Sequence, residues 1–467
     1  MVKSCDKVEG ARKRKGQVRV KQLFKIIPKC LVWLIICSLL GFALVYGAYA
    51  LPERTIIYNA SVSTDFLVSN YISKDTVWMN WADYFTDVVM LNIASFHDEG
   101  ATVFHRAVTN EKIGNTFDIV RWLSERTSIA KTYYSFEEGE ALNEVTTYGK
   151  YWNGYLILLR PMLLYFSMRQ IYTIFRILLA VFFGITVLLL LIKDARFALP
   201  FVLSFLSFHP FSKFCFSYSV IEILLCIFMC VLILCKGLRE SNSKVMIFFF
   251  VQGIVANYFT LMQFSFAIAL FCAVFTAYSV PGKQGVTMQK AKLMISLLLC
   301  YAFGYCAMWM VKWIIILLFD RNSLSEVIYS ISLRLSHEDN GEKVTLSEAL
   351  LWNICGFYYK NKALMYGVLL LGLEAVASVM LHVLKKRNIR DIDLDEGLLP
   401  IIIVAATVIR YALVLNHSKI HYFFMNRLFS GVLFVFLSAG ATYVFRKNSD
   451  NQFEKILPGE KVSESEQ

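Results

Sequence analysis

Two aspartates in the first polar segment are spaced for joint chemistry. Asp83 and Asp87 lie four residues apart in WMNWADYFTDVVMLNIASF, where apolar residues recur at helical spacing. On a helix both carboxylates face the same way, and they repel unless a cation, a metal or a shared proton offsets them. A carboxylate can accept the proton of a hydroxyl group, and Trp81 and Tyr84 offer flat faces for a sugar ring. The pattern predicts a sugar-handling site; the alternative is a solvated helix face without a role.

Basic side chains and histidines supply a candidate anion site. Arg160, directly before Pro161, stands in an apolar context where a charge needs a partner such as a lipid phosphate, or must extend to the interface. The segment NHSKIHYFFMNR places two histidines one helical turn apart. Such a group can hold a phosphate, whereas HxxxH with a carboxylate from elsewhere would bind a divalent metal. The predicted substrate- or phosphate-binding residues are Arg160, Arg334, Arg410, His417, Lys419, His421 and Arg427.

A membrane scaffold must position these side chains. The chain has 467 residues, 57% of them hydrophobic and 18% charged, with a mean hydropathy of +0.54. A soluble chain is about a quarter charged, and a transmembrane helix needs about 20 mostly apolar residues, which several stretches provide. A soluble enzyme, a disordered tail protein and a disulfide scaffold are excluded. The predicted fold is an all-α polytopic membrane protein with about 10 (roughly 9–12) transmembrane helices.

The distribution of charge predicts the orientation. Residues 1–29 contain ten Lys or Arg and two acids, and so contribute 8 of the net formal charge of +12. Together with the apolar stretch 30–51 they are typical of a first transmembrane helix whose N-terminus is cytoplasmic. Since the basic excess is a topology signal, nucleic acid is not an expected partner.

The rest of the chain divides by polarity. An extracytoplasmic loop follows the first helix, with amphipathic helices predicted near 78–96 and 115–130. A multi-span domain comes next, and its outer loop could cover the same face as a lid. The predicted regions are the basic N-terminus 1–29, the first transmembrane helix 30–51, the extracytoplasmic loop 52–151, the transmembrane domain 152–445 with its outer loop 320–362, and the cytoplasmic tail 446–467. This describes a multi-pass cell-membrane protein with both termini cytoplasmic.

The pattern resembles the GT-C class of membrane glycosyltransferases. Members place a catalytic carboxylate in the first outer loop and take sugar from a polyprenyl-phosphate donor on that face, and Asp83 or Asp87 stands where that acid is expected. The segments DYFTDVVMLN, KYWNGYLILLRP, GIVANYFTLMQF and NHSKIHYFFMNR are similar to a poorly characterised group of multi-span proteins of Gram-positive bacteria. That group usually has His where Asn153 stands and Asp at or beside Thr260.

The resemblance and the residues together predict a glycosyltransferase at the extracytoplasmic face. It would use a polyprenyl-phosphate sugar donor to glycosylate an envelope glycan, lipid or protein within the lipid bilayer. Asp83 or Asp87 would be the general base, and Trp81, Tyr84 and Trp152 would frame the sugar. No cofactor is called for, apart from the divalent metal that HxxxH would allow. Two alternatives stay open: a transporter or flippase that uses Glu222 and Glu374, and a non-catalytic protein of envelope assembly.

Overall fold

The protein is built almost entirely of helices. The computed structural model describes residues 2–72, 84–98, 100–114, 118–126, 145–212, 214–279, 287–336, 338–339, 342–362 and 398–456. Within these ranges the strands are two short antiparallel pairs, β1 (Lys112–Ile113) with β2 (Val145–Thr146) and β3 (Glu338–Asp339) with β4 (Glu342–Lys343).

Five helical segments of the described chain are long and apolar enough to cross a membrane. They are Ile26–Tyr49 in α1 (Val2–Tyr49), α7 (Met168–Lys193), α9 (Phe216–Leu234), Met288–Phe319 in α13 (Thr287–Phe319), and Tyr422–Thr442, which joins α19 (Tyr422–Met425), η3 (Asn426–Leu428) and α20 (Phe429–Ile456). Apolar side chains such as Leu39 and Leu188 remain exposed on them, as expected of a surface that faces lipid. The chain is an all-α membrane protein.

Shorter apolar helices fill the space between the long ones. Four of the shorter apolar runs that the sequence counts among its predicted spans are residues 197–211, 245–260, 261–280 and 398–415. They correspond to α8 (Ala198–Leu206), α11 (Asn242–Phe259), α12 (Phe266–Ser279) and α17 (Leu398–Leu413). A 3-10 turn, η1 (Ala195–Phe197), precedes α8, and α10 (Lys236–Arg239) links α9 to α11. The predicted span 364–384, together with Glu374, lies outside the described residues.

Glycines allow α11 and α13 to pack closely. A Cβ atom on Gly253 would overlap the Tyr301 carbonyl, and one on Gly304 would overlap the Phe250 carbonyl. Small residues at such crossings let the backbones of membrane helices touch, which increases their van der Waals contact.

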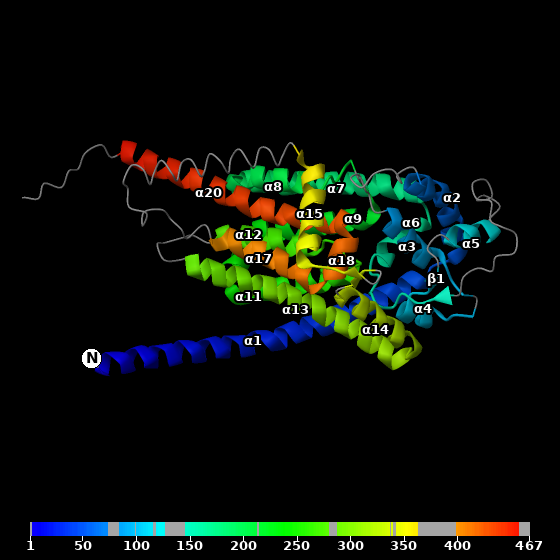
Figure 1. The fold of residues 1–467 in the computed structure, drawn as a ribbon, viewed down its shortest axis with the longest axis horizontal. Coiled ribbons are helices and arrows are strands. Elements are labelled where there is room, and N and C mark those ends of the chain that lie inside the picture. The colour runs from blue at the N-terminus through cyan, green and yellow to red at the C-terminus, as the bar shows by residue number, and fades with distance from the viewer. Residues whose placement is uncertain are drawn as a thin grey trace, which may run out of the picture.

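The residues after the first span form a helical cap at one end of the bundle (Figure 1). We define the cap as α2 (Glu53–Ile72), α3 (Tyr84–Ser95), α4 (Val103–Thr109), α5 (Asp118–Arg126) and α6 (Leu156–Leu163), with β1 and β2. The N-terminus of α1 and the C-terminal end of α20 lie at the opposite end of the molecule (Figure 1).

The prediction of an amphipathic surface helix over 78–96 is wrong for the part that is described. α3 begins at Tyr84, and all its residues from Asp87 to Ser95 are buried. The reason is tertiary, because α2, α6 and α9 all pack against α3. In α5, by contrast, Ile119 and Leu123 are buried while Asp118 is partly exposed, which is the amphipathic pattern expected there.

The predicted outer loop 320–362 folds into α14 (Asn322–Leu335), the β3–β4 hairpin and α15 (Leu346–Lys360). The sequence spacing of Thr345 and Glu348 is that of a capping box, and the structure has it, because each residue accepts a hydrogen bond from the other's backbone N–H. Asn353 of α15 donates to the carbonyl of Ser418 in α18 (Leu415–Ile420) over 2.8 Å. The loop thus covers the segment that carries the two histidines.

Candidate functional site

Asp87 lies at the N-terminus of α9, far away in the sequence. Its Oδ2 accepts the Phe216 backbone N–H over 2.7 Å, and its Oδ1 accepts that of Ser217 over 2.9 Å. The Tyr172 hydroxyl of α7 donates to the same carboxylate. The first N–H groups of a helix lack intrahelical partners and carry partial positive charge. A buried carboxylate therefore caps α9 and joins α3 to α7 and α9.

This position bears on the predicted catalytic roles. Asp87 has no exposed surface, and its two oxygens are already acceptors for three donors. The geometry therefore supports a positioning role for Asp87 more strongly than proton transfer with a substrate. Asp83 and Trp81 lie outside the described residues, and their roles stay predictions.

Tyr84 occupies the edge of the same junction. It is half-buried and stacks on Tyr172, with ring centroids 6.4 Å apart and planes inclined by 16°. Burial, with smaller contributions from Cys215 and Asp87, raises the pKa of Tyr84 to about 12, whereas Arg176 acts in the opposite direction. The phenol is therefore protonated near neutral pH and can donate a hydrogen bond.

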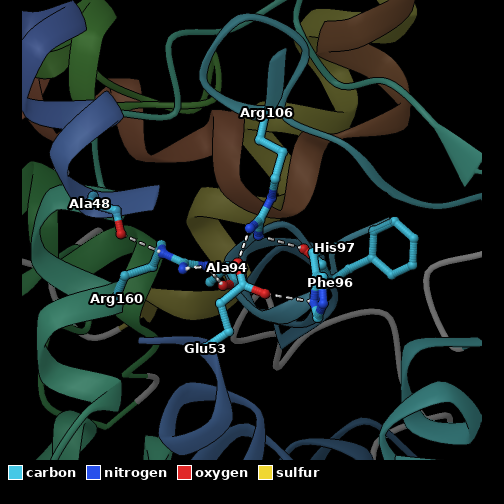
Figure 2. A network of polar contacts seen from close by, with 7 residues as sticks. All are labelled: Ala48, Glu53, Ala94, Phe96, His97, Arg106 and Arg160. Atoms are coloured by element: carbon cyan, nitrogen blue, oxygen red, sulfur yellow. Dashed lines mark hydrogen bonds and ion pairs between the residues drawn. The ribbon is translucent and has the colours of Figure 1, made fainter. Parts of the chain in front are cut away.

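Arg160 belongs to a buried polar network inside the cap (Figure 2). Its Nε donates to the Ala48 carbonyl over 2.8 Å, and its Nη1 donates to the Ala94 carbonyl. These carbonyls belong to the last turns of α1 and α3, where helix carbonyls lack partners and attract cations. Arg160 thus ties the ends of two helices together through Nε and Nη1, while its buried Nη2 has no hydrogen-bond partner among the described residues. Its predicted phosphate-binding role stays a prediction.

A second arginine and one carboxylate complete the network (Figure 2). Glu53 forms an ion pair with Arg106, and its carboxylate lies 2.9 Å from His97 Nδ1 and 3.8 Å from Arg160 Nη2. Arg106 Nη2 also donates to the Phe96 carbonyl over 3.0 Å. Burial, assisted by the Arg106 cation, lowers the pKa of Arg160 to about 9, so the Arg160 guanidinium group is charged at neutral pH. One carboxylate therefore serves two buried cations.

Trp152 is placed in the interior. Its side chain is 1% exposed, and its Nε1 donates to the Met308 carbonyl of α13 over 2.7 Å. A sugar ring cannot reach the buried indole face in this structure, so the burial does not support the predicted role of Trp152 in framing a sugar, which stays a prediction. Lys312, one turn further along α13, donates to the Ala107 and Val108 carbonyls near the end of α4, and so also links the cap to the bundle.

The two histidines lie together beneath α15. The ring centroids of His417 and His421 are 4.4 Å apart; His417 is buried, whereas His421 and Lys419 are partly exposed. Asn416 donates to the Glu338 carbonyl, which holds the β3–β4 hairpin against the same segment. The described residues contain no group of three or more His, Cys, Asp or Glu that could hold a metal ion.

The other predicted cations have different surroundings. Arg427 is 2% exposed, points inward, donates from Nε to the Phe208 carbonyl over 3.2 Å and lies 3.8 Å above the Tyr218 ring. Arg410 of α17 is partly exposed and lies near Tyr301 and Tyr305 of α13. Arg334 belongs to α14, and its side chain is not described. Arg427 thus faces the interior while Arg410 is partly exposed, and their predicted role in binding phosphate stays a prediction.

The sequence analysis missed several ionic residues that prove important. Glu53, His97 and Arg106 come from separate helices or loops, and no local motif connects them. Arg169 and Arg176 were also missed, although their spacing of seven on an apolar helix could have identified them. Comparisons of this chain with protein-family models, with curated proteins and with solved structures find no match.

Proposed function

We propose that the protein is a GT-C-like membrane glycosyltransferase with its cap outside the membrane. In this proposal about ten spans cross the bilayer, both termini are cytoplasmic, and the donor is a sugar linked to a polyprenyl phosphate. The acceptor is an envelope glycan, lipid or protein. The orientation follows the basic N-terminal segment, as the positive-inside rule requires.

The observation that carries the proposal is the junction of α3 with the bundle. Asp87 fixes the first turn of α3 against α7 and α9, both long enough to cross a membrane. Tyr84, the residue next to Asp83, is thereby held half-buried at the cap end of α7. A catalytic acid at the start of α3 would then work at the membrane surface, where the phosphate of a lipid donor lies.

The proposal divides the work between the two acids. Asp83 would accept the proton of the acceptor hydroxyl, and Asp87 would hold α3 at the correct height by capping α9. Tyr84 would contribute an aromatic face and a protonated hydroxyl to the sugar. The α14–α15 segment over His417 and His421 would limit access of water to the same end of the bundle.

Sugar transfer by the purified protein in nanodiscs tests this division. Asp83→Asn should lower kcat by roughly 10²- to 10⁴-fold, the usual contribution of a general base, with little effect on unfolding. Asp87→Asn should lower the unfolding midpoint and activity together. Glu240→Gln, at an exposed site on the far side of the spans, is the matched control. Full activity of Asp83→Asn, Asp87→Asn and the double variant would refute the mechanism.

One observation favours a second function, a transporter or flippase. Glu222 lies within the spanning helix α9 and is 1% exposed, and its Oε1 has no hydrogen-bond partner among the described residues. Arg427, whose Nη1 likewise has none, lies close enough to act on it electrostatically. Unpaired ionisable groups inside a membrane often mark substrate paths. Loss of substrate movement across proteoliposomes in Glu222→Gln, without any sugar transfer by the wild type, would favour this function.

A further inference from the structure

Two arginines of α7 are exposed near its cap end. The Arg169 guanidinium lies 5.2 Å from the centroid of the Phe66 ring, and that of Arg176 lies 4.9 Å from the Phe214 ring. Neither forms a hydrogen bond or an ion pair with its side chain among the described residues, and both side chains are exposed. Each cation is therefore oriented by an aromatic ring while its donors stay free for a ligand.

The two arginines share one face of the helix. Seven residues correspond to almost two full turns and a rise of about 10 Å. Thr173 is exposed on the same face between them. A phosphate group placed over Thr173 would lie between the two guanidinium groups. Guanidinium donors match phosphate oxygens in charge and in planar, bidentate geometry.

Beyond the arginines an exposed apolar stripe runs along the adjacent side of α7, turned by about 100° around the helix axis from the arginine face. Ile177, Val181 and Leu188 are 59%, 50% and 55% exposed. The run from Ile177 to Ile192 rises about 24 Å, which spans most of the roughly 30 Å of hydrocarbon in a bilayer, and Lys193 follows at its other end. Arg176 therefore lies at the cap-end boundary of the hydrocarbon, where lipid phosphates begin. The two arginines and the apolar stripe together match the charged head group and the apolar chain of a lipid.

A lipid bound here would lie next to the proposed catalytic segment. The Phe214 ring that Arg176 covers contacts the Tyr172 ring, and Tyr84 stacks on Tyr172, so Tyr84 lies near this end of α7. Asp83 precedes Tyr84 directly in the sequence. A phosphate held by Arg169 and Arg176 would thus lie close to the start of α3, as a sugar donor must.

We propose that Arg169 and Arg176 bind the phosphate of a membrane lipid whose chain lies along the stripe from Ile177 to Leu188. Extension of a single arginine from the hydrocarbon to water does not explain this arrangement. Two guanidinium groups lie on one face of α7, each over an aromatic ring and without an ionic partner among the described residues. The inference rests on the proposed function only for the identity of the natural lipid, a polyprenyl-phosphate sugar.

Lipid retention measured by native mass spectrometry tests the site. The probe is dioleoyl phosphatidate added to protein in dioleoyl phosphatidylcholine nanodiscs. We expect the wild type to retain one phosphatidate preferentially, and Arg169→Gln/Arg176→Gln to bind it at least tenfold more weakly. Arg169→Lys/Arg176→Lys, which keeps the charge, should bind with intermediate affinity. Lys193→Gln, at the other end of the same helix, is the control and should bind as the wild type does.

The outcomes distinguish a lipid site from a site for free phosphate, and failure of the site from failure of the proposed enzymatic function. Equal retention by the wild type and the Gln/Gln variant, with unchanged unfolding midpoints, would overturn the site. Binding of inorganic phosphate as tight as that of phosphatidate would overturn the lipid part. If Gln/Gln fails to fold, weaker retention by Lys/Lys than by Lys193→Gln is required. Phosphatidate binding without sugar transfer would refute the proposed function alone, whereas transfer with Arg-independent binding would refute only this site.

Discussion

Two pairs of arginines near the cap end differ in their burial and in their partners. Arg106 and Arg160 are buried, share Glu53 and donate to carbonyls at helix ends. Arg169 and Arg176 are exposed, rest on aromatic rings and have no ionic partner in the described part of the chain. The first pair holds helices of the protein together, and the second pair is available to a ligand.

The difference teaches what makes an arginine a candidate ligand. A cation in an apolar sequence context needs a partner, yet the partner can be a backbone carbonyl from another helix. Arg160 attracted attention in the sequence for its apolar surroundings, and the protein itself supplies its partners. The exposed pair is the better candidate, because its donors are not consumed internally.

The largest expected effect comes from removing the shared carboxylate of the buried pair. Glu53→Gln removes the ion-pair partner that two buried guanidinium groups share. It should destabilise the protein by about 3 kcal/mol, at the lower end for buried pairs because Glu53 is 26% exposed. Unfolding in mixed detergent micelles measures it. Glu240→Gln, which breaks the exposed pair with Lys236, should change stability by less than about 1 kcal/mol. Equal losses of stability in Glu53→Gln and Glu240→Gln would show that the buried network stabilises the protein no more than the exposed pair does.

A direct comparison of the two pairs sharpens the contrast. Arg160→Gln should cost about 2 kcal/mol, because the Ala48 and Ala94 carbonyls lose their charged donor. Arg176→Gln should stay within about 0.5 kcal/mol, as at other exposed positions. The same unfolding titration serves both. A destabilisation by Arg176→Gln that matches that of Arg160→Gln would mean that α7 needs its exposed arginine for folding.

The α9 cap predicts a somewhat smaller loss. Asp87→Asn keeps one acceptor oxygen but removes the charge that faces the helix N-terminus. We expect a loss of about 1–2 kcal/mol, typical of caps and charge–dipole contacts in buried geometry. Tyr172→Phe, which removes one donor to the same carboxylate, should cost less. Wild-type stability of Asp87→Asn would indicate that α9 does not depend on this cap.

The smallest expected effect is a dependence on pH in the cap. Burial raises the pKa of Glu111, although His105, at 2.9 Å, and Arg106 lower it. The pKa of Glu111 is higher in the folded state than in the unfolded state. Protonated Glu111 therefore makes its full contribution to the free energy of unfolding below about pH 4.3, and this contribution is lost as the pH rises through the folded-state pKa. Glu111→Gln should reduce the slope of the unfolding midpoint plotted against pH in this range. An unchanged slope would contradict the assignment.

The sequence was a good guide to the elements and a poor guide to their partners. Apolar runs located the five long helices, and the spacing Thr345 to Glu348 gave the start of α15. The two histidines were expected one turn apart and are adjacent. The burial of α3 and Trp152 was not foreseen, because aromatic and apolar residues suit an interface as well as an interior until their neighbours are known.

The sequence by itself determined that this is a helical membrane protein, since the length and polarity of apolar runs are local properties that the bilayer selects. Only the tertiary structure decided which charges are internal. Asp87 reaches α9, and Arg160 reaches the ends of α1 and α3, across separations of roughly 70 to 130 residues. Such contacts depend on where helices meet. The physical reason is that a buried charge is satisfied by any correctly placed dipole or counter-charge, and side-chain type and spacing do not specify which one the fold provides.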